Sequence, residues 1–140
     1  MNTIHTWGLA VVLALLLTAC GDQPASKEDR SKATVEQVIT AARAGNANEV
    51  AKHLVYSGRK DKDRRWKSMF DPAKDDMKDV ERMIEQIKRK LGEGDFQFVD
   101  FRAERESEGE WLVWRVKTAS GEAMFACLDI DGTVGLGDIY

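Results

Sequence analysis

The chain has 140 residues, the usual size of one domain, and its content of 43% hydrophobic and 32% charged residues is that of a folded protein. The formal net charge of −3 argues against a nucleic-acid binder that works through bulk positive charge. Two cysteines and two histidines are too few for a disulfide framework or a clustered structural zinc site. We therefore expect a small globular domain without a metal, a cofactor or a nucleic-acid partner.

The beginning of the chain carries no charged side chain, because the 21 basic and 24 acidic residues all lie beyond position 19. Residues 7–19 read WGLAVVLALLLTA, which matches the apolar region of an export signal. This run is shorter than the roughly 20 residues that a helix needs to cross a bilayer. Residues 1–6 contain no Lys or Arg, so the positive end typical of such a signal is weak. The sequence nevertheless predicts a signal peptide over residues 1–19 that is removed after export.

A single cysteine follows the apolar run. The order Leu17, Thr18, Ala19, Cys20 resembles the lipobox of bacterial lipoproteins, an aliphatic residue and two small residues before the cysteine. The resemblance implies that Cys20 is lipidated and becomes the first residue of the mature chain, anchored in the membrane by two or three acyl chains. The sorting rule of enteric-type bacteria, by the same resemblance, favours the periplasmic face of the outer membrane over the inner membrane, because Gly21 and not an aspartate follows the cysteine. The alternative is a buried apolar helix with an ordinary core cysteine.

Three helices are predicted after a flexible tether. Residues 20–33 contain the lipidated cysteine and no large apolar side chain, so we expect a tether there and a folded domain over residues 34–140. Thr34 and Gln37 have the form of a capping box for a first helix that ends at Gly45. Asn46 or Asn48 caps a second helix, whose apolar face and end are marked by Val50, Ala51, Leu54, Val55 and the pair Ser57-Gly58. A third helix runs from an Asp71 cap and Pro72 to Leu91, with its buried stripe at Met77, Val80, Ile84 and Ile87.

Four strands are predicted beyond Gly94, where the apolar period changes to two. They cover residues 96–101, 111–116, 123–130 and 133–140. Asp131 and Gly132 suit the positive φ angles of a tight hairpin turn. Helices followed by an antiparallel meander indicate an α+β fold, with the helices packed against one face of a curved four-stranded sheet.

The order of these elements also resembles the NTF2-like (cystatin-like) superfamily. The motifs that carry the resemblance are Gly-Asn-Ala-Asn-Glu-Val at residues 45–50 and Asp-Gly-Thr-Val at residues 131–134. The resemblance covers residues 34–140 and implies a cone-shaped domain. Some members use the interior of this cone for small molecules or catalysis, and in others side chains fill it.

Few side chains suggest catalysis. His53 has no partner at ligand spacing, and we expect it to be a surface or boundary residue. The last two strands carry Asp129, Asp138 and Tyr140, which would have to face inward to serve an isomerase- or dehydratase-like enzyme. Cys127 is either a buried small hydrophobe or a free thiol that forms a dimer. No motif indicates an oligomeric state.

The most unusual segment is residues 59–70, RKDKDRRWKSMF. Trp66 lies there among six basic residues, Arg59, Lys60, Lys62, Arg64, Arg65 and Lys67. One interpretation is a solvated loop, and the other is a contact surface for anionic lipid headgroups or an acidic protein partner. Trp111 and Trp114 point to opposite faces of their strand, so that one lies in the core and the other lines a pocket or interface. The residues expected around such a pocket are Trp111, Trp114, Phe125 and Tyr140.

These features together favour a non-enzymatic, lipid-anchored binding module of the cell envelope. Its contacts would be the membrane, through Cys20, and an envelope protein, through residues 59–70. Two alternatives remain open from the sequence. One is an immunity or protective lipoprotein of the periplasm, and the other is the small enzyme described above.

Overall fold

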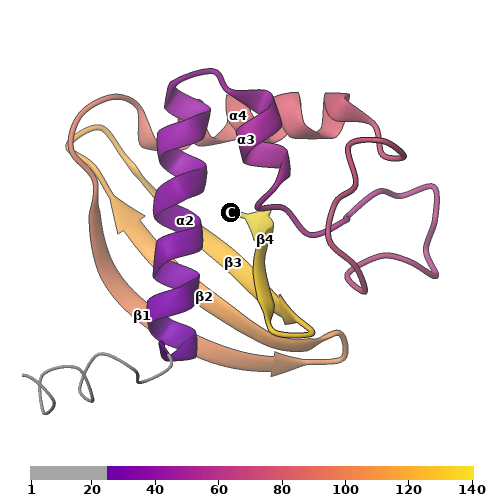
Figure 1. Cartoon of the computed structure of the whole chain (residues 1–140). Coiled ribbons are helices and arrows are strands. Elements are labelled where there is room, and N and C mark those ends of the chain that lie inside the picture. Colours follow the sequence, from indigo (N-terminus) through magenta and orange to yellow (C-terminus); the bar gives the residue numbers. More distant parts are fainter. Residues whose placement is uncertain (1–24) are drawn as a thin grey trace, which may run out of the picture.

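A computed structural model describes residues 25–140 (Figure 1). The predicted signal peptide, the lipobox with Cys20, and Gly21 lie outside the described residues. Within the described part of the chain, no helix combines the length and the apolar character needed to cross a membrane.

The first helix of the domain, α2, spans Lys27–Arg43. Ser26 caps it by accepting a hydrogen bond from the Asp29 N–H at 3.1 Å. The predicted start at Thr34 is therefore wrong, and residues 27–33 are helical rather than a tether. The apolar pattern missed these turns because their inward-facing residue is polar: Ser31 is buried and its hydroxyl accepts a hydrogen bond from the Trp114 indole at 2.9 Å.

The second helix, α3, is a short element over Ala47–Ala51, capped by the Asn46 side chain. The predicted continuation to Ser57 is wrong, because Leu54 and Val55 are extended and form isolated bridges with Leu136 and Met69. Both side chains are buried, as an apolar residue can be in a helix or in a strand. A short apolar run in the sequence therefore did not distinguish the two.

The third helix, α4, spans Met77–Leu91 and buries the predicted stripe Val80, Ile84, Ile87 and Leu91. Its N-cap is Asp76 and not Asp71. Residues 71–75 form a turn instead, because the Asp75 carboxylate turns back to accept a hydrogen bond from the Asp71 N–H at 2.7 Å. The helix ends at Leu91 as predicted, and Gly92, with φ 65°, follows as its C-cap.

The four strands are β1 (Gln97–Glu106), β2 (Gly109–Lys117), β3 (Glu122–Ile130) and β4 (Thr133–Ile139). They pair antiparallel in the order β1-β2-β3-β4, which confirms the α+β class and the meander. Asp131 and Gly132 join β3 to β4 with φ angles of 51° and 88°, as the primed turn requires.

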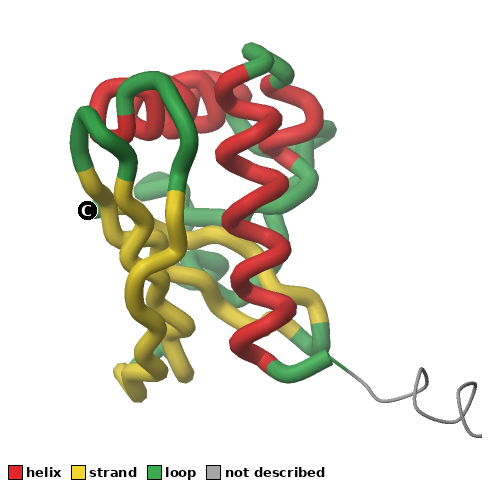
Figure 2. Tube along the Cα trace, turned by 90° about the vertical axis from the view of Figure 1, so that its left-hand side faces the viewer, coloured by secondary structure: helices red, strands yellow, loops and turns green. Residues whose placement is uncertain are grey.

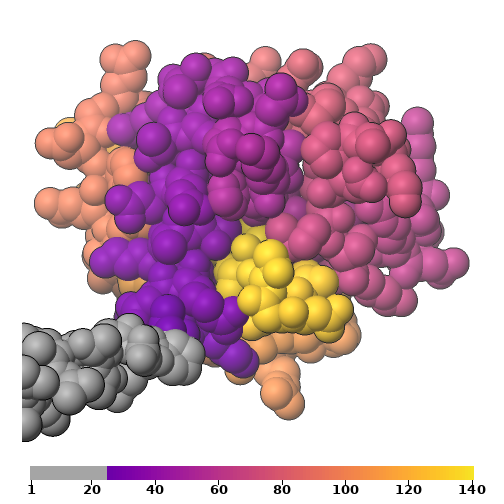
Figure 3. Space-filling model, viewed as in Figure 1, coloured from indigo at the N-terminus to yellow at the C-terminus, as the bar shows by residue number. Residues whose placement is uncertain are grey.

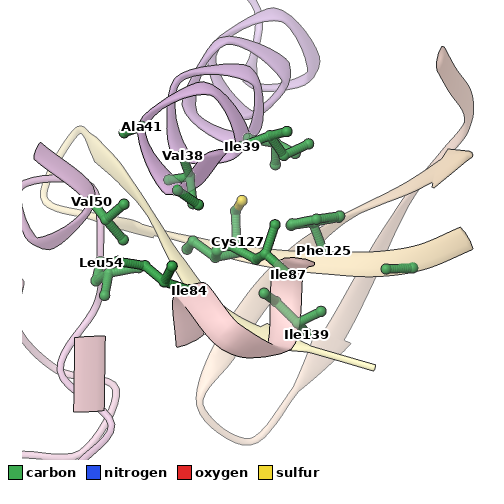
Figure 4. Packing of buried hydrophobic residues seen from close by; sticks show 14 of the residues in the cluster. Val38, Ile39, Ala41, Val50, Leu54, Ile84, Ile87, Phe125, Cys127 and Ile139 are labelled. Atoms are coloured by element: carbon green, nitrogen blue, oxygen red, sulfur yellow. The ribbon is translucent and has the colours of Figure 1, made fainter. Parts of the chain in front are cut away.

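The helices cover one face of the curved sheet, which we call the inner face. α2 crosses this face along its length, and α4 lies across one end of the molecule (Figures 1 and 2). Apolar side chains from both helices and from the sheet fill the space between them, and Phe125 and Cys127 at its centre have no exposed surface (Figure 4). The interior is therefore a packed core.

Candidate functional site: a groove on the outer face of the sheet

Residues 52–76 leave the helical layer and run along the free edge of β4. The Leu136 N–H donates to the His53 carbonyl at 2.7 Å, and the Val55 N–H donates to the Leu136 carbonyl at 2.8 Å. The chain then returns, and the Phe70 N–H donates to the Leu54 carbonyl at 2.9 Å. These bonds cover the edge of the sheet and fix the loop between them, residues 57–68, beside β4 (magenta in Figure 1).

Two glycines on β4 let this loop approach the outer face of the sheet, the face opposite α2. A Cβ atom on Gly135 would lie 2.8 Å from Met69 Sδ, and one on Gly137 would lie 2.8 Å from the Trp111 ring and 2.9 Å from the Trp66 ring. Any larger residue would push the loop away, so the alternating glycines explain how Trp66 reaches the sheet.

Trp66 holds an uncommon backbone conformation for a bulky residue, with φ 62°. Its N–H donates to the Tyr56 carbonyl at 3.1 Å. Its ring meets the Trp111 ring edge-on, with the centroids 5.1 Å apart and the planes at 78°. The Arg65 guanidinium lies over the Trp66 ring at 4.8 Å from its centroid. The loop and β2 thus form an aromatic corner on the outer face.

An open groove of about 340 Å³ adjoins this corner, and we call it the outer groove. Strand pairing explains its floor, because Val113 on β2 lies opposite Ala126 on β3, and Ala126 lies opposite Asp138 on β4. Glu104 on β1 is the pairing partner of Trp111. The groove is lined by Arg65, Trp66, Glu104, Glu106, Glu108, Trp111, Val113, Ala126, Asp138 and Tyr140. Four carboxylates, three aromatic rings and one guanidinium therefore surround an apolar floor.

Neighbouring groups organise part of this charge. Arg102 forms an ion pair with Glu104 at 2.6 Å and donates a hydrogen bond to the Tyr140 hydroxyl at 3.2 Å.

The carboxyl group of Glu108 has a lowered pKa. The backbone N–H of Glu108 makes the largest contribution, and Ser107, the Trp111 side chain and the charge of Arg65 lower this pKa further. Glu108 is therefore ionised at neutral pH.

A second hollow of about 420 Å³ adjoins the groove at Arg65, Trp66 and Glu108. Lys62 and Lys67 line it, so the sign of the charge changes at that end. A third, open hollow of about 590 Å³ follows α2 and α3, where small and polar residues such as Ala33, Thr40 and Ala44 line it. It contains no aromatic side chain and no cationic one.

The basic segment divides into two kinds of residue. Arg64 is structural, because its guanidinium binds both oxygens of Asp75, at 2.5 and 3.0 Å, and stacks on the Tyr56 ring at 4.2 Å. Burial raises the pKa of the Asp75 carboxyl, but the Arg64 guanidinium and the Asp71 N–H lower it by more, so that the pKa lies below its ordinary value. The assignment of Arg64 to a contact surface is therefore wrong. The other basic residues of the segment are exposed: Arg59, Lys60, Lys62, Arg65 and Lys67.

The four residues predicted around a pocket lie on both faces of the sheet. Trp111 and Tyr140 line the outer groove, and Tyr140 is 49% exposed. Trp114 and Phe125 are buried in the core under α2, so their assignment to a pocket is wrong. The alternation of side chains along the strand correctly predicted that Trp111 and Trp114 point to opposite faces of the sheet. It did not show which of the two faces the helices cover.

The remaining candidate groups lie at the surface, at its boundary or in the core. Asp129 pairs with Arg30 of α2 at 2.9 Å, and Asp138 is exposed on the outer face. Cys127 is buried, and burial raises the pKa of its thiol to about 12, so it is an inert core residue. His53 is half-buried, with Nε2 3.5 Å from a carboxylate oxygen of Glu49.

The acidic residues of the groove on β1, Glu104 and Glu106, were not predicted as site residues. A signal existed, because Arg102, Glu104 and Glu106 alternate along one face of the strand, and Gly135 and Gly137 alternate in the same way on β4. Strand pairing is what places both sets beside Trp111, and pairing cannot be inferred from either strand alone.

Comparisons of the chain with protein-family models, with curated proteins and with solved structures find no match. Its function must therefore be inferred from its own residues.

Proposed function

We propose that this chain is a lipid-anchored, non-enzymatic binding module of the bacterial cell envelope. Cys20 is its anchor, the outer groove and the exposed loop beside it are its contact surface, and its setting is the periplasmic face of the outer membrane. The observation that carries the proposal is the order Leu17, Thr18, Ala19, Cys20 directly after an uncharged apolar run.

The start of α2 adds to this proposal. Only six residues, 21–26, separate Cys20 from Lys27 at the start of the helix. Even a fully extended chain of that length spans about 20 Å. A lipidated Cys20 would therefore hold the domain directly beside the bilayer, without a long linker between them.

The packing of the interior favours binding over catalysis. The element order supports an NTF2-like cone, and an enzyme of that plan needs a cavity inside the cone where a general base is shielded from water. Here Phe125, Cys127 and Leu136 fill that space, and none of the three has exposed surface. Asp138 and Tyr140 lie on the opposite face in contact with solvent.

The proposal is tested by changing the anchor and locating the protein. The unaltered chain should sediment with membranes, resist extraction by high salt and be released by detergent. Cys20→Ser should leave the protein out of the membrane fraction, because the thioether cannot form. Cys127→Ala is the matched control, since it removes the buried thiol and should leave membrane attachment unchanged. Membrane attachment of Cys20→Ser equal to that of the unaltered chain would contradict the proposal.

A further inference from the structure

We infer that the outer groove binds a linear aliphatic polyamine, a flexible chain of methylene groups carrying several protonated amines. This inference deepens the proposed function by naming the ligand class of the binding face. The groove itself does not depend on the lipid anchor, so the two are tested separately.

The aromatic corner supplies the first element of recognition. Trp66 and Trp111 meet at 78°, and Tyr140 lines the same groove, where its hydroxyl accepts a hydrogen bond from Arg102 at 3.2 Å. Aromatic faces attract cations through the negative charge above the ring. The Trp66 ring already carries a cation, since the Arg65 guanidinium lies 4.8 Å from its centroid. Arg65 is exposed, so a ligand amine can take its place without opening the core.

The distribution of the carboxylates favours an extended cation over a metal ion. Glu104 and Glu106 come from β1, Glu108 from the turn after it and Asp138 from β4. In the described part of the chain, no three carboxylate, histidine or cysteine groups come close enough together to hold a metal ion. Arg102 already pairs with Glu104, so the carboxylates that face a ligand are those of Glu106, Glu108 and Asp138. Separate carboxylates along a groove suit a ligand with separate amines.

The floor of the groove suits the part of the ligand between its amines. Val113 and Ala126 are buried apolar residues at the base of the groove, and methylene groups pack on such a surface. The volume of about 340 Å³ is that of a small-molecule site. Lys62 and Lys67 at the adjoining hollow repel a cation, which limits the ligand to the acidic end.

The inference is tested by calorimetric titration of the full-length protein in detergent. The probes are spermidine, the neutral 1,8-octanediol and a short oligolysine peptide. We expect saturable binding of spermidine at one site, weakened by added salt, and no binding of the diol. Glu106→Gln and Asp138→Asn should each weaken spermidine binding about two- to fivefold, the loss expected for one exposed ion pair.

Matched controls separate the groove from general negative charge. Glu36→Gln on α2 and Glu85→Gln on α4 remove one exposed carboxylate elsewhere and should leave the affinity unchanged. Equal weakening by the controls, absence of spermidine binding, or binding of oligolysine without spermidine would each overturn the inference. Cys20→Ser should bind spermidine like the unaltered protein. A failure of the ligand inference is therefore distinct from a failure of the anchor.

Discussion

Residues of one type have different roles within the loop of residues 57–68. Arg64 and Arg65 are adjacent in the sequence, yet Arg64 is bound to Asp75 whereas Arg65 is exposed above Trp66. The difference follows from Asp75, whose side chain is only 4% exposed and needs a cationic partner. A count of basic residues therefore overstates the contact surface that the loop offers.

Asp75→Asn tests this role. The substitution keeps the shape of the side chain but removes the charge that Arg64 binds, and it should lower the free energy of unfolding by about 1–3 kcal/mol. Asp63→Asn, exposed on the same loop, should have little effect. Urea unfolding measures both, and equal stability of Asp75→Asn and the unaltered protein would contradict the assignment.

The effect of Asp75 should also depend on pH with a defined sign. Its pKa in the folded protein is below the ordinary value, so the stabilisation is fully present above about pH 4. It declines as the pH falls further and the carboxyl takes up a proton in the folded state. The stability difference between the unaltered protein and Asp75→Asn should therefore shrink below pH 4, and a difference that grows on acidification would refute this account.

Gly137 is the residue on which the aromatic corner depends most closely. Gly137→Ala places a methyl group against both the Trp66 and Trp111 rings and should destabilise the protein by about 1–3 kcal/mol. The near-ultraviolet circular dichroism of the tryptophans should change with it. Gly135→Ala is the comparison on the same strand, because its methyl group would meet Met69 and Val55 and neither tryptophan; it should destabilise the protein as well but change that spectrum less. An unchanged spectrum for Gly137→Ala would show that the two rings are not held as described.

At the scale of the elements, the sequence predicted those parts that carry a complete local signal. The stripe of α4 and the turn at Asp131 and Gly132 are read directly from spacing and residue type. Leu54 and Val55 were misassigned because their extended conformation depends on Leu136, which lies about 80 positions away in the sequence. Arg65, Trp66, Trp111, Asp138 and Tyr140 of the outer groove were named from the sequence, but not as one site, because strand pairing is what makes them neighbours of each other and of the acidic residues of β1.

The early start of α2 depends on the buried hydroxyl of Ser31, which can be removed by substitution. Ser31→Ala removes the acceptor of the buried Trp114 indole N–H and should cost about 1–3 kcal/mol of unfolding free energy. A flexible tether would tolerate the same change without loss. Ser107→Ala, in the exposed turn between β1 and β2, is the control and should be neutral. Chemical denaturation measures both variants. An unfolding free energy of Ser31→Ala equal to that of the unaltered protein would favour a flexible tether over a helix at residues 27–33.

At the scale of the whole molecule, the two faces of the sheet have separate roles. The inner face and α2 enclose the packed core, whereas the outer face carries the groove and the surrounding charge. Seen from the side of α2, the yellow surface of the end of the chain lies between α2 and the segment that follows α3 (Figure 3). This division lets a ligand bind on the outer face without any rearrangement of the core.

In the proposed function, acyl chains on Cys20 attach this domain to a membrane, and the mass of the native protein reveals whether they are present. Intact-mass spectrometry of the protein purified from membranes should give a chain that begins at Cys20 and carries the added mass of a diacylglycerol group, with or without a third acyl chain. A chain that retains residues 1–19 and has no acyl mass on Cys20 would show that this cysteine is not an anchor.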